Sequence, residues 1–240
     1  MHASAHVMQR VVFPTPEALA EQTADLIARR VGRPGDELES FTIALPGGST
    51  PRGLFRLLAE SPYTTRINWG RLQLFWTDER CVPPDDPRSN YRMAAEELLE
   101  RVPIPTGNIH RIHGEDAPEA AARAYAAEIR SVLGNRRGFD LVLLGVGVDG
   151  HTASLFPGDD ALDTVEELAV AVHRPPPEPP RVTLTLAALR WAHELLFLVT
   201  GKEKRSVLRR LDAGEDLPAA RIRPEEGRLL WFIDRAASPA

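Results

Sequence analysis

The chain has 240 residues, of which 43% are hydrophobic, and a formal net charge of −5. This length can bury a substantial core, and no change in composition marks a boundary, so we expect one domain over residues 1–240. An acidic chain disfavours proteins that bind nucleic acid or membrane surfaces through an excess of positive charge. The single cysteine, Cys81, leaves no possibility of an internal disulfide.

The N-terminal segment and the hydropathy of the chain predict a cytoplasmic protein. Residues 1–10 contain polar side chains and histidines where a signal peptide needs an apolar core. No apolar run approaches the roughly 20 residues that cross a bilayer. We expect neither a membrane nor a nucleic-acid partner, and the sequence is compatible with a monomer or a small homo-oligomer.

Short apolar runs alternate with amphipathic segments along the chain, which is typical of βαβ units. Strands are expected at Phe41–Leu45, Leu72–Trp76, Leu141–Leu144, Leu168–Val172, Leu195–Val199 and Leu229–Ile233. Helices are expected at Pro16–Arg30, Pro51–Ala59, Ser89–Arg101, Pro118–Leu133, Leu186–His193 and Lys202–Leu211. Because the strands are continuously apolar, they predict a mainly parallel sheet covered on both faces, a three-layer α/β/α sandwich.

Ligands of such sheets bind beyond the carboxyl ends of the strands, so the residues that follow each strand are the first candidates for a site. After the first expected strand comes Pro-Gly-Gly-Ser-Thr-Pro, residues 46–51. Gly47 and Gly48 let the backbone approach an anion, Ser49 and Thr50 supply hydroxyl groups, and a helix N-terminus follows. The segment predicts a phosphate cradle; the alternative is a tight turn with a Ser or Thr N-cap.

Charged residues follow the second expected strand directly, as Thr-Asp-Glu-Arg at residues 77–80. Asp78 and Arg80 are candidates for one shared cleft, in which the arginine would offer planar donors to a phosphate. The alternative is a solvated loop with an Asp–Arg pair and a Ser89 N-cap on the next helix. Cys81 has no partner base in the sequence pattern, and we interpret it as structural.

Glycines are concentrated after the third expected strand, in Gly-Val-Gly-Val-Asp-Gly-His at residues 145–151. Gly145, Gly147 and Gly150 match the G-x-G-x-x-G pattern of dinucleotide-binding proteins. That pattern requires a full helix after the glycines and an acidic residue at the end of the next strand. Here Pro157 interrupts the chain and the next strand is followed by His173 and Arg174, so we reject the dinucleotide fingerprint. A nicotinamide dehydrogenase is kept as an alternative that a titration with NADP⁺ would test.

The same segment presents His151 two residues after Asp149. Imidazole titrates near neutral pH, so it can take a proton from water and return it to a leaving oxygen. A nearby carboxylate can orient the ring. The sequence therefore predicts that His151 is a general acid/base and that Asp149 is its partner.

A fourth group of polar residues follows the strand expected at Leu195–Val199. This segment, Thr-Gly-Lys-Glu-Lys-Arg at residues 200–205, contains both lysines of the chain. A cation in the first turn of a helix is disfavoured by the helix dipole, which is a mild argument that Lys202 or Lys204 serves a ligand. The alternative is a pair of solvated side chains. No spacing of histidines or cysteines is typical of a metal site, and we expect none.

Three blocks resemble the glucosamine-6-phosphate isomerase/6-phosphogluconolactonase family, and within it the 6-phosphogluconolactonases: PGGSTP, TDER with the following VP and DDPRSNY, and LGVGVDGHTASLFPG. The resemblance spans about residues 10–235. It implies a Rossmann-like fold, hydrolysis of the sugar-phosphate lactone 6-phospho-D-glucono-1,5-lactone in the second step of the oxidative pentose phosphate pathway, and no cofactor.

The resemblance also implies roles for individual residues. His151 would be the catalytic acid/base, with Asp78 close to it. The phosphate ligands would be Gly48, Ser49, Thr50, Arg80 and Lys204. Arg181 and Arg174 are weaker candidates, because the proline-rich segment 175–180 departs from the usual form of the family.

Two substitutions favour a lactonase over a glucosamine-6-phosphate deaminase or sugar-phosphate isomerase. Phe156 stands where the deaminase pattern has a glutamate, and Arg80 stands where it has a tyrosine. A deaminase needs additional acid/base groups, whereas hydrolysis of an activated ester does not. A non-catalytic sugar-phosphate sensor is a further alternative; it would lack the histidine and carry a DNA-binding module.

Overall fold

The computed structural model describes residues 7–35, 39–164 and 166–239. Its centre is a six-stranded parallel sheet in the order β1-β9-β8-β5-β2-β3. The strands are β1 (Val7–Phe13), β2 (Phe41–Leu45), β3 (Leu72–Trp76), β5 (Leu141–Leu144), β8 (Glu194–Val199) and β9 (Arg228–Asp234). Residues 1–6, which belong to the segment expected to lack a signal peptide, lie outside the described residues.

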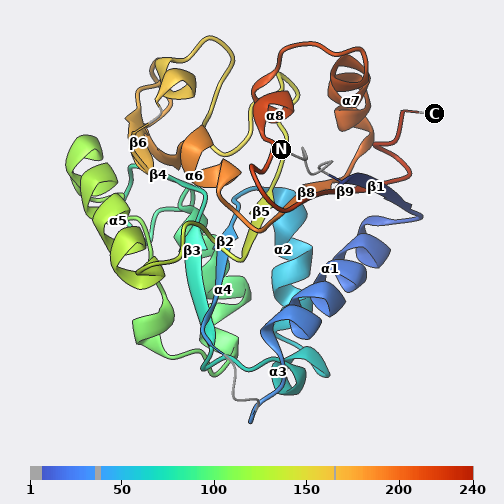
Figure 1. The fold of residues 1–240 in the computed structure, drawn as a ribbon, viewed down its shortest axis with the longest axis vertical. Helices are drawn as coiled ribbons and strands as arrows, with labels where there is room; N and C mark the ends of the chain where they lie inside the picture. Colours follow the sequence, from blue (N-terminus) through green and yellow to red (C-terminus); the bar gives the residue numbers. More distant parts are fainter. Residues whose placement is uncertain (1–6, 36–38, 165, 240) are drawn as a thin grey trace, which may run out of the picture.

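A smaller antiparallel sheet, in the order β4-β7-β6, lies above one end of the large sheet (Figure 1). Its strands are β4 (Asp78–Arg80), β6 (Ala169–Val172) and β7 (Arg181–Leu184). Only Thr77 separates β3 from β4, so the chain passes from one sheet into the other where the charged residues begin. This sheet holds Asp78, Arg80 and Arg181 on neighbouring strands.

The helices form the outer layers of the sandwich. They are α1 (Pro16–Val31), α2 (Ser49–Leu58), α3 (Tyr63–Arg66), α4 (Asn90–Glu97), α5 (Pro118–Leu133), α6 (Leu186–Arg190), α7 (Arg205–Asp212) and α8 (Pro218–Arg221). Short 3-10 helices are η1 (Leu99–Arg101), η2 (Thr106–Asn108), η3 (Asp160–Asp163) and η4 (Lys202–Lys204). α1 and α2 pack together on one side of the sheet, and α5 lies on the other (Figure 1). The three-layer prediction is confirmed.

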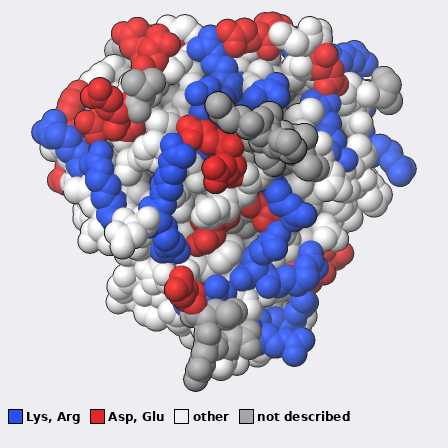
Figure 2. Space-filling view, viewed as in Figure 1, with Lys and Arg blue, Asp and Glu red and all other residues white. Residues whose placement is uncertain are grey.

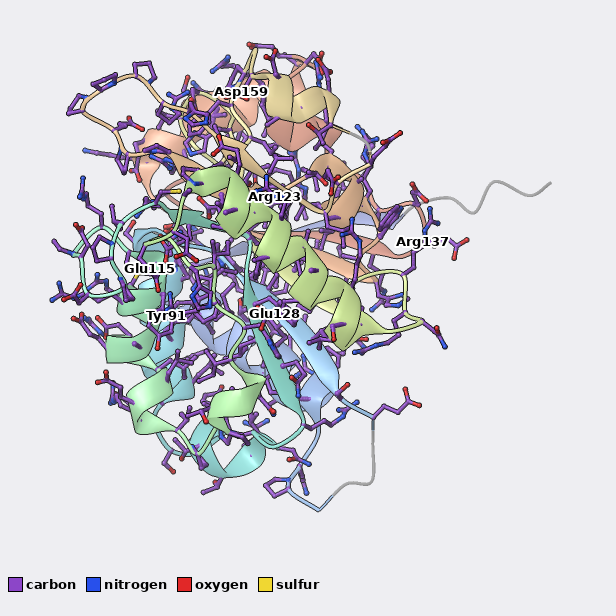
Figure 3. All side chains as sticks on the ribbon, turned by 90° about the vertical axis from the view of Figure 1, so that its left-hand side faces the viewer. Tyr91, Glu115, Arg123, Glu128, Arg137 and Asp159 are labelled. Atoms are coloured by element: carbon purple, nitrogen blue, oxygen red, sulfur yellow. The ribbon has the colours of Figure 1, made fainter. Side chains whose placement is uncertain are left out.

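Burial of the strands explains why they form the centre. Every residue of β2, β5 and β8 is buried, as expected for strands covered on both faces. α5 is amphipathic: Tyr125 and Ile129 face the core, and Arg123 and Glu128 lie on the helix as it is seen in Figure 3. Glu128 Oε1 forms a 2.7 Å hydrogen bond with Nδ1 of the buried His110, which joins the helix to the sheet.

The structure corrects the sequence-based prediction in three respects. The strand expected at Leu168–Val172 does not join the parallel sheet, because β6 pairs antiparallel with β7 across the proline-rich segment. Strands β1, β4 and β7 were not predicted, since each is short, at a sheet edge, or alternating in polarity. The helix expected at Ser89–Arg101 breaks at Leu98, whose backbone (φ −135°, ψ −62°) separates α4 from η1.

The chain leaves neighbouring strands β2 and β5 in opposite directions. β2 leads through α2 to β3, whereas β5 leads through the small sheet to β8 on its other side. Such a reversal opens a crevice at the carboxyl ends of the two strands, and ligands of α/β proteins bind there. The GGST segment and the His151 segment therefore flank one opening.

Two surface properties bear on possible partners. On the face shown in Figure 2, acidic and basic side chains are interspersed rather than divided into large fields of one sign. Among the described residues, no helix combines the length and the apolar character needed to span a membrane.

Candidate active site

Loops from four parallel strands line a cleft of about 240 Å³ at the carboxyl edge of the sheet. The segments after β2, β3, β5 and β8 all contribute, as the sequence predicts from the polarity of those junctions. The lining residues include Gly47, Gly48, Ser49, Thr50, Asp78, Arg80, Asn90, Gly147, His151, Arg181, Glu203 and Lys204. All of the residues carried over from the family resemblance except Arg174 are among them.

One wall of the cleft is the N-terminus of α2. Gly48 is the N-cap residue with φ +96°, a conformation that favours glycine, and among the described residues no side-chain hydrogen bond caps the helix. The first N–H groups of the helix are therefore available to an anion, and the helix dipole favours negative charge there. The Thr50 hydroxyl forms a 2.9 Å hydrogen bond with the Thr200 hydroxyl, which fixes this wall to the end of β8.

Three cationic side chains line the same cleft: Arg80 from β4, Arg181 from β7 and Lys204 from η4. Arg80 donates from Nη1 to the carbonyl oxygen of Arg88 at 2.5 Å, and Arg181 donates from Nη2 to Glu178 at 2.9 Å. Lys202 does not line the cleft. These cations line the same cleft as the α2 N-terminus, together with the carboxylates Asp78 and Glu203, and the N-terminus and the cations favour an anion.

Asp78 is buried at the floor of the cleft, with 6% of its surface exposed. Its Oδ2 accepts a hydrogen bond from the Ser154 hydroxyl at 2.7 Å, and Ser154 N donates to Thr183 at 3.1 Å. Asp78 and His151 both line the cleft, but within the described ranges no hydrogen bond joins them. Asp78 is therefore a fixed carboxylate near the histidine rather than its direct partner.

His151 is paired with Asp149, as predicted. Nδ1 of the imidazole lies 2.5 Å from Asp149 Oδ1, and the same oxygen accepts the backbone N–H of His151 at 3.1 Å. Gly147 makes this turn possible, because a Cβ there would lie 2.1 Å from the imidazole Nδ1. Burial raises the pKa of Asp149, but the hydrogen bonds from His151 outweigh it and lower that pKa below its usual value.

Several residues of the site were missed by the sequence-based analysis. Buried Glu79 accepts hydrogen bonds from the backbone N–H groups of Arg80, Asn90 and Tyr91, each at 2.7 Å, and from the Ser89 hydroxyl at 2.9 Å. These bonds fix the start of α4 against β4 and place the Asn90 side chain in the cleft. The Ser89 N-cap was a readable signal, but the carboxylate partner was not.

The glycine pattern at 145–150 does not introduce a helix. Thr152 and Leu155 form an isolated β-bridge, and over residues 145–159, all of which are described, no helix begins. This geometry agrees with the rejection of a dinucleotide site. Within the described ranges, no three His, Cys, Asp or Glu side chains are grouped as metal ligands.

Comparison with known proteins places this cleft in a family. A model of the family described as glucosamine-6-phosphate isomerases/6-phosphogluconolactonase matches residues 14–231. The chain belongs to this family. A 6-phosphogluconolactonase of Haemophilus influenzae is 39% identical over 234 residues, covering 96% of this chain and 98% of the relative.

Solved structures of this family have the same architecture. The crystal structure of a 6-phosphogluconolactonase from Thermotoga maritima superimposes with a TM-score of 0.81 at 33% identity, covering 96% of this chain and 100% of the other. A monomeric glucosamine-6-phosphate deaminase superimposes with a TM-score of 0.80 at 23% identity, covering 96% and 98%, which shows a common fold alone. Architecture therefore does not separate the two activities, and residues of the cleft must do so.

Proposed function

We propose that the chain hydrolyses 6-phospho-D-glucono-1,5-lactone to 6-phospho-D-gluconate, the second step of the oxidative pentose phosphate pathway. The observation that carries the proposal is a single cleft lined both by His151, which is paired with Asp149, and by the α2 N-terminus. An enzyme that hydrolyses a sugar-phosphate lactone needs both a group that transfers protons and a site that binds the phosphate. The similarity to proteins named 6-phosphogluconolactonase over nearly the whole chain supports the same conclusion.

The phosphate binds at the α2 N-terminus in this proposal. Backbone N–H groups from Gly48 to Thr50 and the two hydroxyl groups donate hydrogen bonds to it, and the helix dipole adds to the attraction. Arg80, Lys204 and Arg181 supply positive charge from the other walls. Binding at this remote group holds the lactone carbonyl in place for attack by water.

His151 transfers the protons in the proposed reaction. Its imidazole accepts a proton from water as the water oxygen attacks the lactone carbonyl, giving a tetrahedral intermediate. When the bond between the carbonyl carbon and the ring oxygen breaks, the imidazolium returns the proton to that oxygen. Asp149 holds Nδ1, so Nε2 is left for the proton transfer, and Asp78 is positioned to accept a hydrogen bond from a substrate hydroxyl.

Phe156 argues against the deaminase alternative. It occupies the place where the deaminase pattern has a glutamate, and its buried ring lies next to His151 at 4.6 Å between ring centroids. The additional carboxylate that ring opening and proton shuttling between carbons would need is thus replaced by an apolar ring. A simple hydrolase uses only the histidine and its carboxylate.

The test is a lactonase assay with freshly generated lactone, coupled to 6-phosphogluconate dehydrogenase and compared with the spontaneous rate. We expect the wild-type protein to exceed that rate and His151→Ala to lose about 10²–10⁴-fold in kcat. Asp149→Asn should lose less, because the imidazole remains but its orientation is weakened. Release of ammonia from glucosamine 6-phosphate is expected to be undetectable.

His173→Ala is the matched control, because His173 is also paired with a carboxylate, Glu119 at 2.7 Å, but is exposed and outside the cleft. It should retain wild-type kcat. Wild-type protein that does not exceed the spontaneous rate would refute the lactonase proposal. Full activity in His151→Ala would leave the activity standing and refute the mechanism.

A further inference from the structure

The Phe156 ring contacts both the catalytic histidine and two arginines. Its centroid is 4.6 Å from that of the His151 imidazole, with the planes inclined by 36°. The guanidinium carbon of Arg174 lies 3.8 Å from the same ring centroid, and that of Arg181 lies 5.4 Å from it. Phe156 is itself only 6% exposed. These four side chains, called the stack below, are thus joined through one buried ring.

The arginine side of the stack is held by the segment between β6 and β7. Glu178 Oε2 lies 2.9 Å from Arg181 Nη2 and 3.7 Å from Arg174 Nε. The Nε atoms of both arginines are buried, and neither has a hydrogen-bond partner among the described residues. Besides Glu178, both cations contact the Phe156 ring, and cation–π attraction favours that contact.

The histidine side of the stack has few other restraints. Asp149 holds Nδ1, and Gly147 lies beneath that edge of the ring. In the described part of the chain, Nε2 has no hydrogen-bond partner. One hydrogen bond allows the imidazole to rock about the Cβ–Cγ bond, and the face contact with Phe156 opposes that motion.

We propose that Phe156 is a positioning residue for His151, backed by Arg174, Arg181 and Glu178. The ring fixes the plane of the imidazole so that Nε2 points to the lactone carbonyl, and the two arginines limit the movement of the ring through their contacts with it. The proposal deepens the lactonase function and rests on it for its kinetic consequence. It gives Arg174, which does not line the cleft, a role through Phe156 instead of through the phosphate.

The kinetic test compares Phe156→Leu with Phe41→Leu. Phe41 is also a buried phenylalanine with an arginine over its ring, Arg71 at 5.6 Å, but it lies at the far end of β2 from the cleft. Phe156→Leu should lose about ten- to a hundredfold in kcat, because a misplaced catalytic group loses its alignment. Its KM should change little, and Phe41→Leu should retain wild-type kcat.

A second pair examines the arginine layer. Arg174→Gln should lower kcat in the same direction as Phe156→Leu but less, while Arg137→Gln should leave it unchanged. Arg137 lies over the Trp191 ring at 5.0 Å, away from the cleft. An unchanged kcat in Phe156→Leu, a rise in KM in place of the fall in kcat, or an equal loss in Phe41→Leu would each overturn the proposal.

An NMR measurement separates this proposal from the lactonase proposal, because it needs no substrate. In wild-type protein we expect nuclear Overhauser contacts between the ring protons of His151 and Phe156, and one sharp set of imidazole signals. In Phe156→Leu those signals should broaden or double. If the wild type lacks lactonase activity yet shows this behaviour, the positioning role stands and the assigned reaction fails. Unchanged imidazole signals in Phe156→Leu would overturn the positioning role.

Discussion

Burial and hydrogen bonding shift the pKa values of two carboxylates beside the cleft, Glu79 and Asp149, in opposite net directions. Burial raises the pKa of Glu79, and the four hydrogen bonds from Arg80, Asn90, Tyr91 and Ser89 only partly offset it. Burial also raises the pKa of Asp149, but the hydrogen bonds from His151 have the larger effect, and the pKa is lowered. Asp149 is therefore ionised at neutral pH and able to orient an imidazole, whereas the oxygens of Glu79 are occupied by backbone groups.

Cys81 gives a prediction at the same scale. Burial raises the pKa of its thiol to about 11, and the negative charges of Glu79 and Glu119 act in the same direction. Because the thiolate is the reactive form, the folded protein should react with iodoacetamide at pH 8 about a hundredfold more slowly than the unfolded chain. The rate should keep rising as the pH passes 9. Mass spectrometry of carbamidomethylated protein measures both.

The matched variant for this prediction is Cys81→Ser, which should retain lactonase activity because no step of the proposed mechanism uses the thiol. Equal rates of alkylation in the folded and unfolded protein would show that the thiol is not protected. If alkylation of Cys81 abolished activity while Cys81→Ser remained active, the thiol would lie closer to the substrate than the structure indicates.

At the scale of elements, the start of α2 depends on a close approach to α4. A Cβ on Gly47 would lie 2.0 Å from Asn90 Oδ1, and Asn90 cannot withdraw freely because its Nδ2 donates to the Asp78 carbonyl oxygen at 2.8 Å. Two elements from different parts of the chain are thus joined at the phosphate cradle. Glycine is required here by contact with a neighbour, and by backbone conformation at the adjacent Gly48.

Alanine substitutions at two glycines test this contact. Gly47→Ala should destabilise the fold by about 1–3 kcal/mol and raise KM, since the overlap displaces either Asn90 or the cradle. Gly53→Ala, inside α2 and with nothing within 4 Å of its Cβ position, should stabilise the fold by about 0.5–1 kcal/mol. Urea unfolding and steady-state kinetics measure the two effects.

The opposite signs expected for these variants make the comparison informative. A Gly47→Ala protein as stable as Gly53→Ala, with an unchanged KM, would mean that Asn90 can rotate away at little cost. The contact between α2 and α4 would then not contribute to the shape of the cradle.

At the scale of the whole molecule, the cleft is formed by both sheets, so a ligand that fills it should stabilise the folded chain as a unit. We also propose one domain for residues 1–240, because a single hydrophobic cluster extends from Leu19 to Ala237. A ligand at about a hundred times its Kd adds about 2.7 kcal/mol. For a chain of this size that corresponds to a rise in Tm of about 5–10 °C.

We expect 6-phosphogluconate, the product, to raise Tm by this amount in a thermal scan. Gluconate should not, because it lacks the phosphate. Lys204→Gln should reduce the shift, whereas Lys202→Gln, whose side chain is exposed and does not line the cleft, should leave it unchanged. Equal rises in Tm in the two lysine variants would show that Lys204 does not bind the phosphate.

The sequence by itself determined the layered α/β architecture, because continuous apolar runs between amphipathic segments leave few other ways to bury them. It also predicted that four polar junctions meet, since the carboxyl ends of parallel strands lie on one edge. The pairing of Asp149 with His151 was readable for a local reason: two residues in one tight turn are necessarily close.

Only the tertiary structure decided the arrangements between distant segments. β4 and β7 are too short for a periodic pattern of hydrophobic residues to predict them. They form a sheet because β7 pairs with β4 on one side and with β6 on the other. The bonds of Glu79 to α4 and the stack of Arg174 on Phe156 join residues far apart in the chain. Sequence pattern reports which residues are buried or polar, but contacts of this kind depend on how the packed elements meet.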